Sequence, residues 1–124
     1  MSDARGCQRG RAVASGGVRC AVALLVCLIG CGNPAGGATG GPEVFQSVCA
    51  ACHGLAGTPD PAMVARLGVK DLNAAEFRTK VTIELVENQV RTGSKNKLMP
   101  SFEGALTDAQ IRAVAAYVSG TPFP

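Results

Sequence analysis

Large aromatic side chains are scarce in this chain. Its 124 residues contain no Trp, one Tyr and four Phe, although hydrophobic residues of all kinds make up 47%. A single domain of this size therefore has few large side chains with which to fill a core. Leu, Val and Ala can fill a small core, and a buried apolar cofactor would also make up the shortfall. The scarcity is compatible with a cofactor without requiring one.

An excess of charge is also missing from the part of the chain expected to fold. The formal net charge is +3, but five charged residues precede the apolar run at 20–29: Asp3, Arg5, Arg9, Arg11 and Arg19. The chain has 12 basic and nine acidic residues in all. Leaving out these four arginines and one aspartate, eight basic and eight acidic residues remain. A nucleic-acid-binding protein needs a basic patch on its folded part. The charge balance therefore gives no support to a nucleic-acid partner.

The hydrophobic run at 20–29 is short. It has about half of the ~20 residues that a membrane-spanning helix needs. A basic stretch followed by a short apolar run is typical of a secretory signal peptide, and a buried N-terminal helix is the alternative. The clustered arginines and the lack of a polar face favour a signal peptide at residues 1–30, removed on export across the bacterial inner membrane.

The end of this run, Leu28-Ile29-Gly30-Cys31, resembles the lipobox of bacterial lipoproteins. The resemblance implies that Cys31 becomes lipid-modified and N-terminal, and that acyl chains hold the protein on a membrane at its periplasmic side. Cleavage at a nearby small residue of an ordinary signal peptide is the alternative. Residues 31–41 are rich in Gly and predict a flexible linker with a reach of roughly 15–20 Å. The folded domain is then expected over residues 42–124.

Cysteine positions exclude a disulfide framework. Of the six cysteines, Cys7, Cys20 and Cys27 fall in the predicted signal peptide and Cys31 is the lipid candidate. Only two remain in the domain, and the sole histidine of the chain follows them, in the segment Cys49-Ala50-Ala51-Cys52-His53. C-x-x-C-H is the attachment pattern of haem c. Two thiols add across the two vinyl groups of the macrocycle, and the adjacent imidazole is placed under the ring to bind iron.

A C-x-x-C pair has two other common uses, in zinc sites and in redox-active dithiols. A structural zinc ion takes four ligands, and the domain has no further Cys or His to complete them. A thioredoxin-like dithiol expects alternating strands and helices, which this sequence does not show. Covalent haem attached at Cys49 and Cys52, with His53 as one iron ligand, is the prediction.

The domain is expected to be all-α, with short helices between long loops. A helix beginning at Pro42 carries the haem cysteines at its end, and a loop follows at 54–59. Asp60 and Pro61 open a helix that ends at Leu67 before Gly68. Asn73 and Glu76 form a variant capping box for a short helix at 74–79.

Two longer helices complete the prediction. Thr82 caps a helix from Ile83 to Thr92 with three inward residues, Ile83, Val86 and Val90, although a strand at 80–85 is possible. Residues 93–106 form a loop. Thr107 and Gln110 form a capping box for the last helix, whose apolar face carries Ile111, Val114, Ala115 and Val118.

A second iron ligand is expected from a methionine. Met1 leaves with the signal peptide, and Met63 follows His53 closely, inside a short helix. Met99 lies in a loop much further along, so only its path passes easily around the edge of the ring. A thioether opposite histidine stabilises ferrous iron and raises the reduction potential. The alternative role of Met99 is to fill a gap in the core.

From Gly41 onward the chain resembles the class I c-type cytochromes. Four motifs carry the resemblance in order: Gly41-x-x-x-Phe45-x-x-x-Cys49, Cys49-Ala50-Ala51-Cys52-His53-Gly54, Met99-Pro100-x-Phe102, and the segment from Leu106 to Val118. The resemblance implies four to five short helices around one haem c, with Gly41 and Phe45 against Tyr117 where the first and last helices cross. It also implies a proline carbonyl that orients His53, from Pro59 or Pro61.

The function implied by this resemblance is electron transfer rather than catalysis. With His53 and Met99 both on iron, no position is open for a small-molecule substrate, and the partners are redox proteins. Lys95 and Lys97 form either a basic rim that guides an acidic partner or ordinary solvated charges. The alternatives are a haem subunit of a larger oxidoreductase and a haem enzyme or gas-binding protein with an open sixth position.

Overall fold

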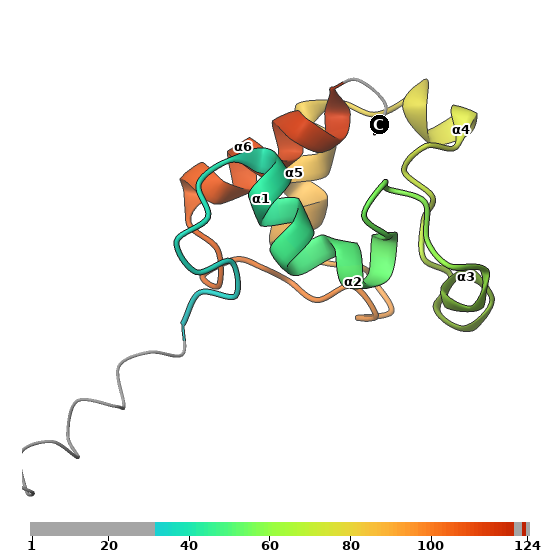
Figure 1. The fold of residues 1–124 in the computed structure, drawn as a ribbon, viewed down its shortest axis with the longest axis horizontal. Coiled ribbons are helices and arrows are strands. Elements are labelled where there is room, and N and C mark those ends of the chain that lie inside the picture. The colour runs from blue at the N-terminus through green and yellow to red at the C-terminus, as the bar shows by residue number, and fades with distance from the viewer. Residues whose placement is uncertain (1–31, 121–122, 124) are drawn as a thin grey trace, which may run out of the picture. The chain divides into compact units, whose positions relative to one another are not determined.

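The computed structural model describes residues 32–120 and 123 (Figure 1). The chain divides into two units, Met1–Gly30 and Cys31–Pro124. The predicted signal peptide at residues 1–30 and the predicted lipid attachment at Cys31 lie outside the described residues.

The described part of the chain is helical. Its elements are α1 (Gly41–Val44), η1 (Phe45–Cys49), α2 (Ala50–His53), α3 (Pro61–Leu67), α4 (Ala75–Arg78), α5 (Ile83–Thr92) and α6 (Asp108–Ser119). Because α1, η1 and α2 follow one another without a break, these elements make five helical segments. The only β pairing among the described residues is an isolated bridge between Glu103 and Leu106. The all-α prediction is confirmed, and no strand forms at 80–85, where α5 begins at Ile83.

The first helical segment, α1–η1–α2, contains a π-helical turn. In η1 the Ala50 N–H donates to the Phe45 carbonyl, five residues back instead of four. Single π turns occur mostly within α-helices and often at functional sites. Here the turn ends at Cys49, so it sets the direction in which Cys52 and His53 of α2 continue. Gly54 ends the segment at φ +74°.

Helices α1 and α6 cross closely at Gly41, as predicted. A Cβ on Gly41 would come within 2.4 Å of the Ala113 carbonyl oxygen and 2.6 Å of the Tyr117 Cβ. The Phe45 ring meets the Tyr117 ring edge-on, with centroids 5.6 Å apart, and Phe123 completes the cluster at 4.8 Å from Phe45. Three of the five aromatic residues of the chain thus meet at this crossing.

Substituting Gly41→Ala is expected to destabilise the haem-loaded protein by about 1–3 kcal/mol, because the added methyl group overpacks the crossing against backbone atoms. Denaturant unfolding measures the change. Gly37→Ala is the matched control, since its Cβ meets no atom within 4 Å. Equal losses in both variants would contradict a close packing role for Gly41.

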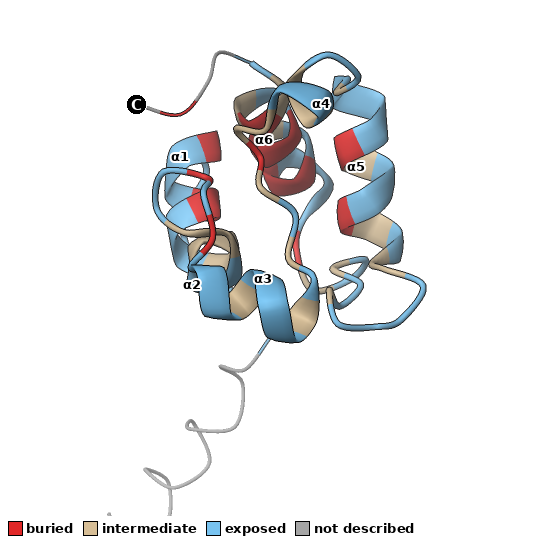
Figure 2. Cartoon of the chain, turned by 90° about the vertical axis from the view of Figure 1, so that its right-hand side faces the viewer, coloured by how far each residue is buried: buried red, intermediate tan, exposed pale blue. Residues whose placement is uncertain are grey.

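The core lies between α1, α5 and α6, whose buried faces turn toward one another (Figure 2). Both predicted caps are confirmed: Thr82 accepts a hydrogen bond from the Leu85 N–H, and Thr107 with Gln110 forms a capping box. The predicted apolar face of α6 is buried throughout, with Ile111, Val114, Ala115 and Val118.

Two details of the helix predictions are wrong. The N-cap of α4 is Ala74, whose methyl group makes no capping hydrogen bond. Asn73 does not cap the helix, because its side chain donates to the Ala56 carbonyl (2.6 Å) and to the Thr58 hydroxyl (3.1 Å). In α5, Val86 and Val90 are buried as predicted, but Ile83 is 44% exposed. Ile83 is the first residue of its helix, where the chain has only just joined the packed face.

The Gly-rich segment before α1 is part of the folded domain. Ala35 is buried in the core cluster, the Asn33 side chain donates to the Gln110 side chain of α6, and that side chain in turn donates to the Ala38 carbonyl. The prediction that the domain begins only after a flexible linker at 31–41 is therefore wrong for residues 33–38. The Gln110 side chain, which is distant in the sequence, holds the segment by hydrogen bonds that its Gly-rich composition does not predict.

Candidate functional site

One cavity of about 500 Å³ opens between the helices. One wall comes from the α1–η1–α2 segment, and the others come from α5, α6, the chain between α3 and α4, and the loop before α6. The lining is mostly apolar, and four sequence-predicted site residues are part of it: Cys49, Cys52, His53 and Met99. Residues that lie 46 positions apart in the sequence therefore border the same space.

The two cysteines of this wall are free thiols. Burial raises the pKa of the Cys49 thiol to about 11, and the nearby Cys52 adds to the rise. A redox-active dithiol requires the opposite, a cysteine whose pKa is lowered so that it is a thiolate near neutral pH. The environment of Cys49 therefore argues against a thioredoxin-like function.

The ring of His53 is held by a backbone carbonyl. Its Nδ1 lies 3.0 Å from the Lys70 oxygen, which makes Nδ1–H the donor and leaves Nε2 free to bind a metal. Burial lowers the pKa of His53, although the Lys70 carbonyl favours the protonated form. The neutral ring is the form that binds iron. Neither Pro59 nor Pro61 supplies the orienting carbonyl, so the prediction of a proline in this role is wrong.

Lys70 could not be found from the sequence because any residue can offer a backbone carbonyl. It stands after Gly68, whose left-handed backbone (φ +63°) ends α3 and turns the chain toward His53. The glycine after a predicted helix indicated a turn there. It did not indicate which carbonyl would meet the ring.

Met99 is placed by a tight loop between α5 and α6. The Ser94 hydroxyl accepts from the Met99 N–H (2.9 Å), and the Ser94 N–H donates to the Met99 carbonyl (2.9 Å). Gly93 lies beneath this loop, since a Cβ there would come within 2.6 Å of the Met99 oxygen. The methionine thus sits on a braced turn, at the cavity wall and half-buried.

Gln89 of α5 is a site residue that sequence reasoning missed. Its Nε2 donates to the Gly93 carbonyl (2.8 Å) and lies 3.9 Å from the Met99 sulfur. An amide N–H beside the sulfur draws electron density from it. The sequence gives only a weak indication of this role. Gln89 precedes the inward-facing Val90, but a polar side chain at that position is equally compatible with a solvent-exposed residue.

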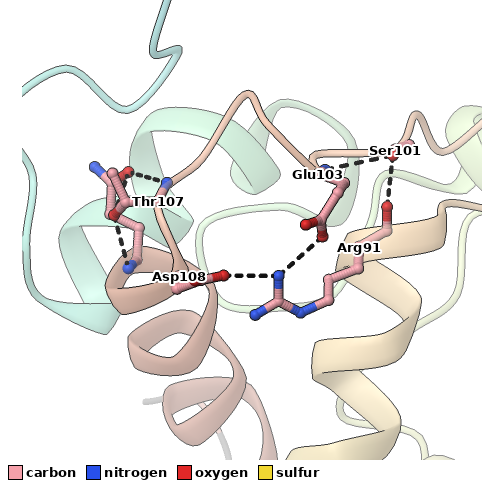
Figure 3. Close-up of polar contacts among 6 residues, drawn as sticks. Arg91, Ser101, Glu103, Thr107 and Asp108 are labelled. Atoms are coloured by element: carbon pink, nitrogen blue, oxygen red, sulfur yellow. Dashed lines mark hydrogen bonds and ion pairs between the residues drawn. The ribbon is translucent and has the colours of Figure 1, made fainter.

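An ionic network closes the far side of the Met99 loop (Figure 3). Arg91 at the end of α5 bonds to Glu103 of the loop (2.8 Å) and to Asp108 of α6 (2.9 Å). Hydrogen bonds to Glu103, and then to Asp108, raise the pKa of Arg91 further above neutrality. The Ser101 hydroxyl donates to the Arg91 carbonyl. The loop is therefore attached to both helices that flank it.

Within residues 32–120 and Phe123, no three His, Cys, Asp or Glu side chains gather as a separate metal-ion site. None of the helices described is long and apolar enough to cross a membrane.

The residues present fit a haem c group. The cavity offers apolar walls to the macrocycle, two thiols one helical turn apart for its vinyl groups, and an imidazole already oriented by Lys70 for its iron. Met99 lines the same space and can supply a thioether.

Comparisons with known proteins agree with a haem c protein. The family model described as cytochrome C oxidase, cbb3-type, subunit III, matches residues 36–118. Cytochrome c6 of Leptolyngbya boryana is 40% identical over 83 residues, which cover 65% of this chain and 88% of that protein. The cbb3-type oxidase subunit CcoP of Cereibacter sphaeroides is 31% identical over 84 residues, 64% of this chain but only 26% of that subunit.

A solved structure shares the fold. The KustC0563 c-type cytochrome superimposes with a TM-score of 0.58 and 27% sequence identity, covering 65% of this chain and 95% of its own. With the family model, the cytochrome c6 relatives and the site geometry in agreement, the chain belongs to the small class I c-type cytochromes, electron-transfer proteins that bind haem c covalently.

Proposed function

We propose that this cytochrome is a membrane-anchored one-electron carrier in which His53 and Met99 are the two axial ligands of the iron and Cys49 and Cys52 form the thioether bonds. The observation that carries the proposal is the shared cavity, which all four side chains line. When bound, the haem iron supplies a one-electron Fe(II)/Fe(III) couple.

The role of the chain is to keep the surroundings of the iron unchanged while an electron enters or leaves. The Lys70 carbonyl holds the His53 ring, and Ser94 braces Met99 from the other part of the cavity wall. The apolar walls contributed by α5 and α6 keep water away from the iron. Ligands held in this way need little rearrangement between the two oxidation states.

The anchor and the location follow from the N-terminal sequence. Residues 1–30 act as the signal peptide, Cys31 carries the lipid, and the domain stands at the periplasmic side of a membrane, where it meets redox proteins. Lys95 and Lys97 are both exposed on the Met99 loop, which supports a role in guiding an acidic partner.

The proposal is tested by the mass and the spectrum of the native protein. The expected mass includes one haem and the acyl groups, and lacks residues 1–30. The expected oxidised spectrum is low-spin, with the long-wavelength band of methionine bound to ferric haem. A high-spin spectrum would contradict Met99 ligation, and an unprocessed N-terminus would contradict the anchor, so the two parts are read separately.

A haem subunit of a larger oxidoreductase is the second candidate. The match to the cbb3-type subunit III family and the likeness to one segment of CcoP favour it. Gentle detergent extraction distinguishes the two: a subunit elutes with its oxidase, whereas a free carrier elutes alone.

An open sixth position for a substrate or gas is less well supported, because Met99 lines the cavity on a braced loop. Reduced protein exposed to carbon monoxide tests it. A carrier with Met99 bound should show little spectral change at neutral pH, whereas an open iron would bind the gas at once.

Gln89→Val is expected to lower the reduction potential by about 20–60 mV. Loss of a hydrogen bond worth about 0.5–1.5 kcal/mol to the Met99 sulfur removes a preference for ferrous iron, and for one electron 59 mV corresponds to about 1.4 kcal/mol. Equilibrium redox titration measures the shift. Asn88→Val, at the exposed neighbouring position of α5, is the matched control and should leave the potential unchanged.

A further inference from the structure

Gln110 of α6 fastens the N-terminal segment to the domain. Its side chain is 5% exposed, and its Oε1 accepts from the Asn33 Nδ2 at 2.7 Å. Its Nε2 donates to the Ala38 carbonyl, also at 2.7 Å. The same Oε1 accepts from the Thr107 N–H at 3.0 Å, so one buried amide both caps α6 and binds the segment. A buried amide is stable only when its donors and acceptors are paired.

The segment held by Gln110 has a defined structure of its own. The Ala35 N–H donates to the Asn33 Oδ1 (3.0 Å), and the Gly36 N–H donates to the Asn33 carbonyl (2.9 Å). Ala35 is 6% exposed and belongs to the core cluster. Gly36 takes the left-handed backbone (φ +55°) that glycine adopts without strain. We call residues 33–38 with Gln110 the clasp.

The clasp shortens the distance between the domain and Cys31. A chain spans at most about 3.3–3.6 Å per residue, and only Gly32 stands between Cys31 and Asn33 in the sequence. A free linker over residues 31–41 would reach roughly 15–20 Å on average and would let the domain turn in any direction. The clasp therefore replaces a tether with a close attachment.

We propose that the clasp is a mount: it seats the face formed by residues 32–38 and the first turn of α6 on the phospholipid headgroup surface and fixes the orientation of the haem relative to the membrane. The inference rests on the proposed acylation of Cys31. The partner of this face is a lipid surface, reached through the acyl chains of the same protein.

The mount leaves the electron-transfer site accessible. None of the described residues at 32–40 lines the cavity. In Figure 1 the segment runs beside α1 and α6, on the side of the domain away from α3. A redox protein embedded in the same membrane would then meet the cavity side at a constant height. Fixing the orientation removes the rotational search that a loosely tethered carrier must make.

The test uses the full-chain, haem-loaded, acylated protein in vesicles of phosphatidylcholine with a fluorescent headgroup label. Quenching of the label by the haem reports distance, and linear dichroism of the haem on oriented bilayers reports orientation. Wild-type protein is expected to quench strongly and to show clear dichroism. The variant Asn33→Ala/Gln110→Ala is expected to lose at least about half of each signal, because a released segment regains its free reach.

Two further variants keep the proposal falsifiable if the double variant folds poorly. An insertion of six Gly and Ser residues between Gly32 and Asn33 leaves the clasp intact but lengthens the attachment. It should lower both the quenching and the dichroism as much as the double variant does. Gln46→Ala, an amide removed from an exposed position of η1, is the matched control and should change neither.

The outcomes separate the mount from the anchor. Acylated protein that floats with the vesicles but shows no dichroism, or an insertion variant indistinguishable from wild type, would overturn the mount alone. Protein that carries no lipid at Cys31 and does not float would contradict the anchor itself, and the mount with it.

Discussion

Met99→Ala is expected to lower the reduction potential by roughly 0.2–0.3 V and to convert the oxidised protein from low-spin to high-spin. The thioether stabilises ferrous iron, and axial-ligand identity spans about 0.8 V among haem proteins. Redox titration measures the first change, and the loss of the long-wavelength methionine band measures the second. Reduced Met99→Ala should also bind carbon monoxide, which the wild-type protein should bind poorly.

Met63→Ala is the matched control for this prediction. Met63 lies in α3, is half-buried and does not line the cavity, so its loss should leave potential and spectrum unchanged. A potential that moves in the Met63 variant and not in the Met99 variant would contradict the ligand assignment. Unchanged spectra in both would show that neither methionine binds iron.

The features predicted correctly are those that short stretches of sequence determine. Thr107 and Gln110 form a capping box because their spacing alone brings each side chain to the other's backbone. The contact of Gly41 and Phe45 with α6 joins distant residues, and it was predictable only because the motifs resemble those of the class I c-type cytochromes. The C-x-x-C-H pattern ending at His53 is also local in the sequence, and the structure places its two thiols and its imidazole on one wall of the cavity.

The features predicted wrongly depend on partners far away in the chain. The segment at 33–38 has the composition of a free linker, but its bond from Asn33 to Gln110 joins residues 77 positions apart. Asn73 can serve as a cap or bind a loop carbonyl with equal ease, and only the fold brings the Ala56 carbonyl within reach. The Lys70 carbonyl is chemically like every other. No local pattern distinguishes such contacts before the chain has folded.

Cys49→Ser/Cys52→Ser is expected to make the haem extractable by acidified organic solvent, and the haem-free protein is expected to lose cooperative unfolding. The reason is the size of the cavity, about 500 Å³. Without the haem, the apolar walls of this cavity would lose the surface against which they are buried, at ~25 cal/mol per Å² of apolar area, and a whole domain is stabilised by only about 5–15 kcal/mol. Near-ultraviolet circular dichroism and thermal melting of the haem-free protein measure the loss.

The single variants Cys49→Ser and Cys52→Ser are the controls, since each retains one thioether bond and should keep its haem through extraction. A haem-free protein that melts as cooperatively as the wild type would contradict the prediction. It would mean that the walls close on one another without the haem, and that Phe45, Tyr117 and Phe123 at the α1–α6 crossing suffice as a core. Of these three aromatic residues only Phe45 lines the cavity, so the other apolar side chains of its walls, among them Phe77 and Phe102, would lose the haem as their packing partner.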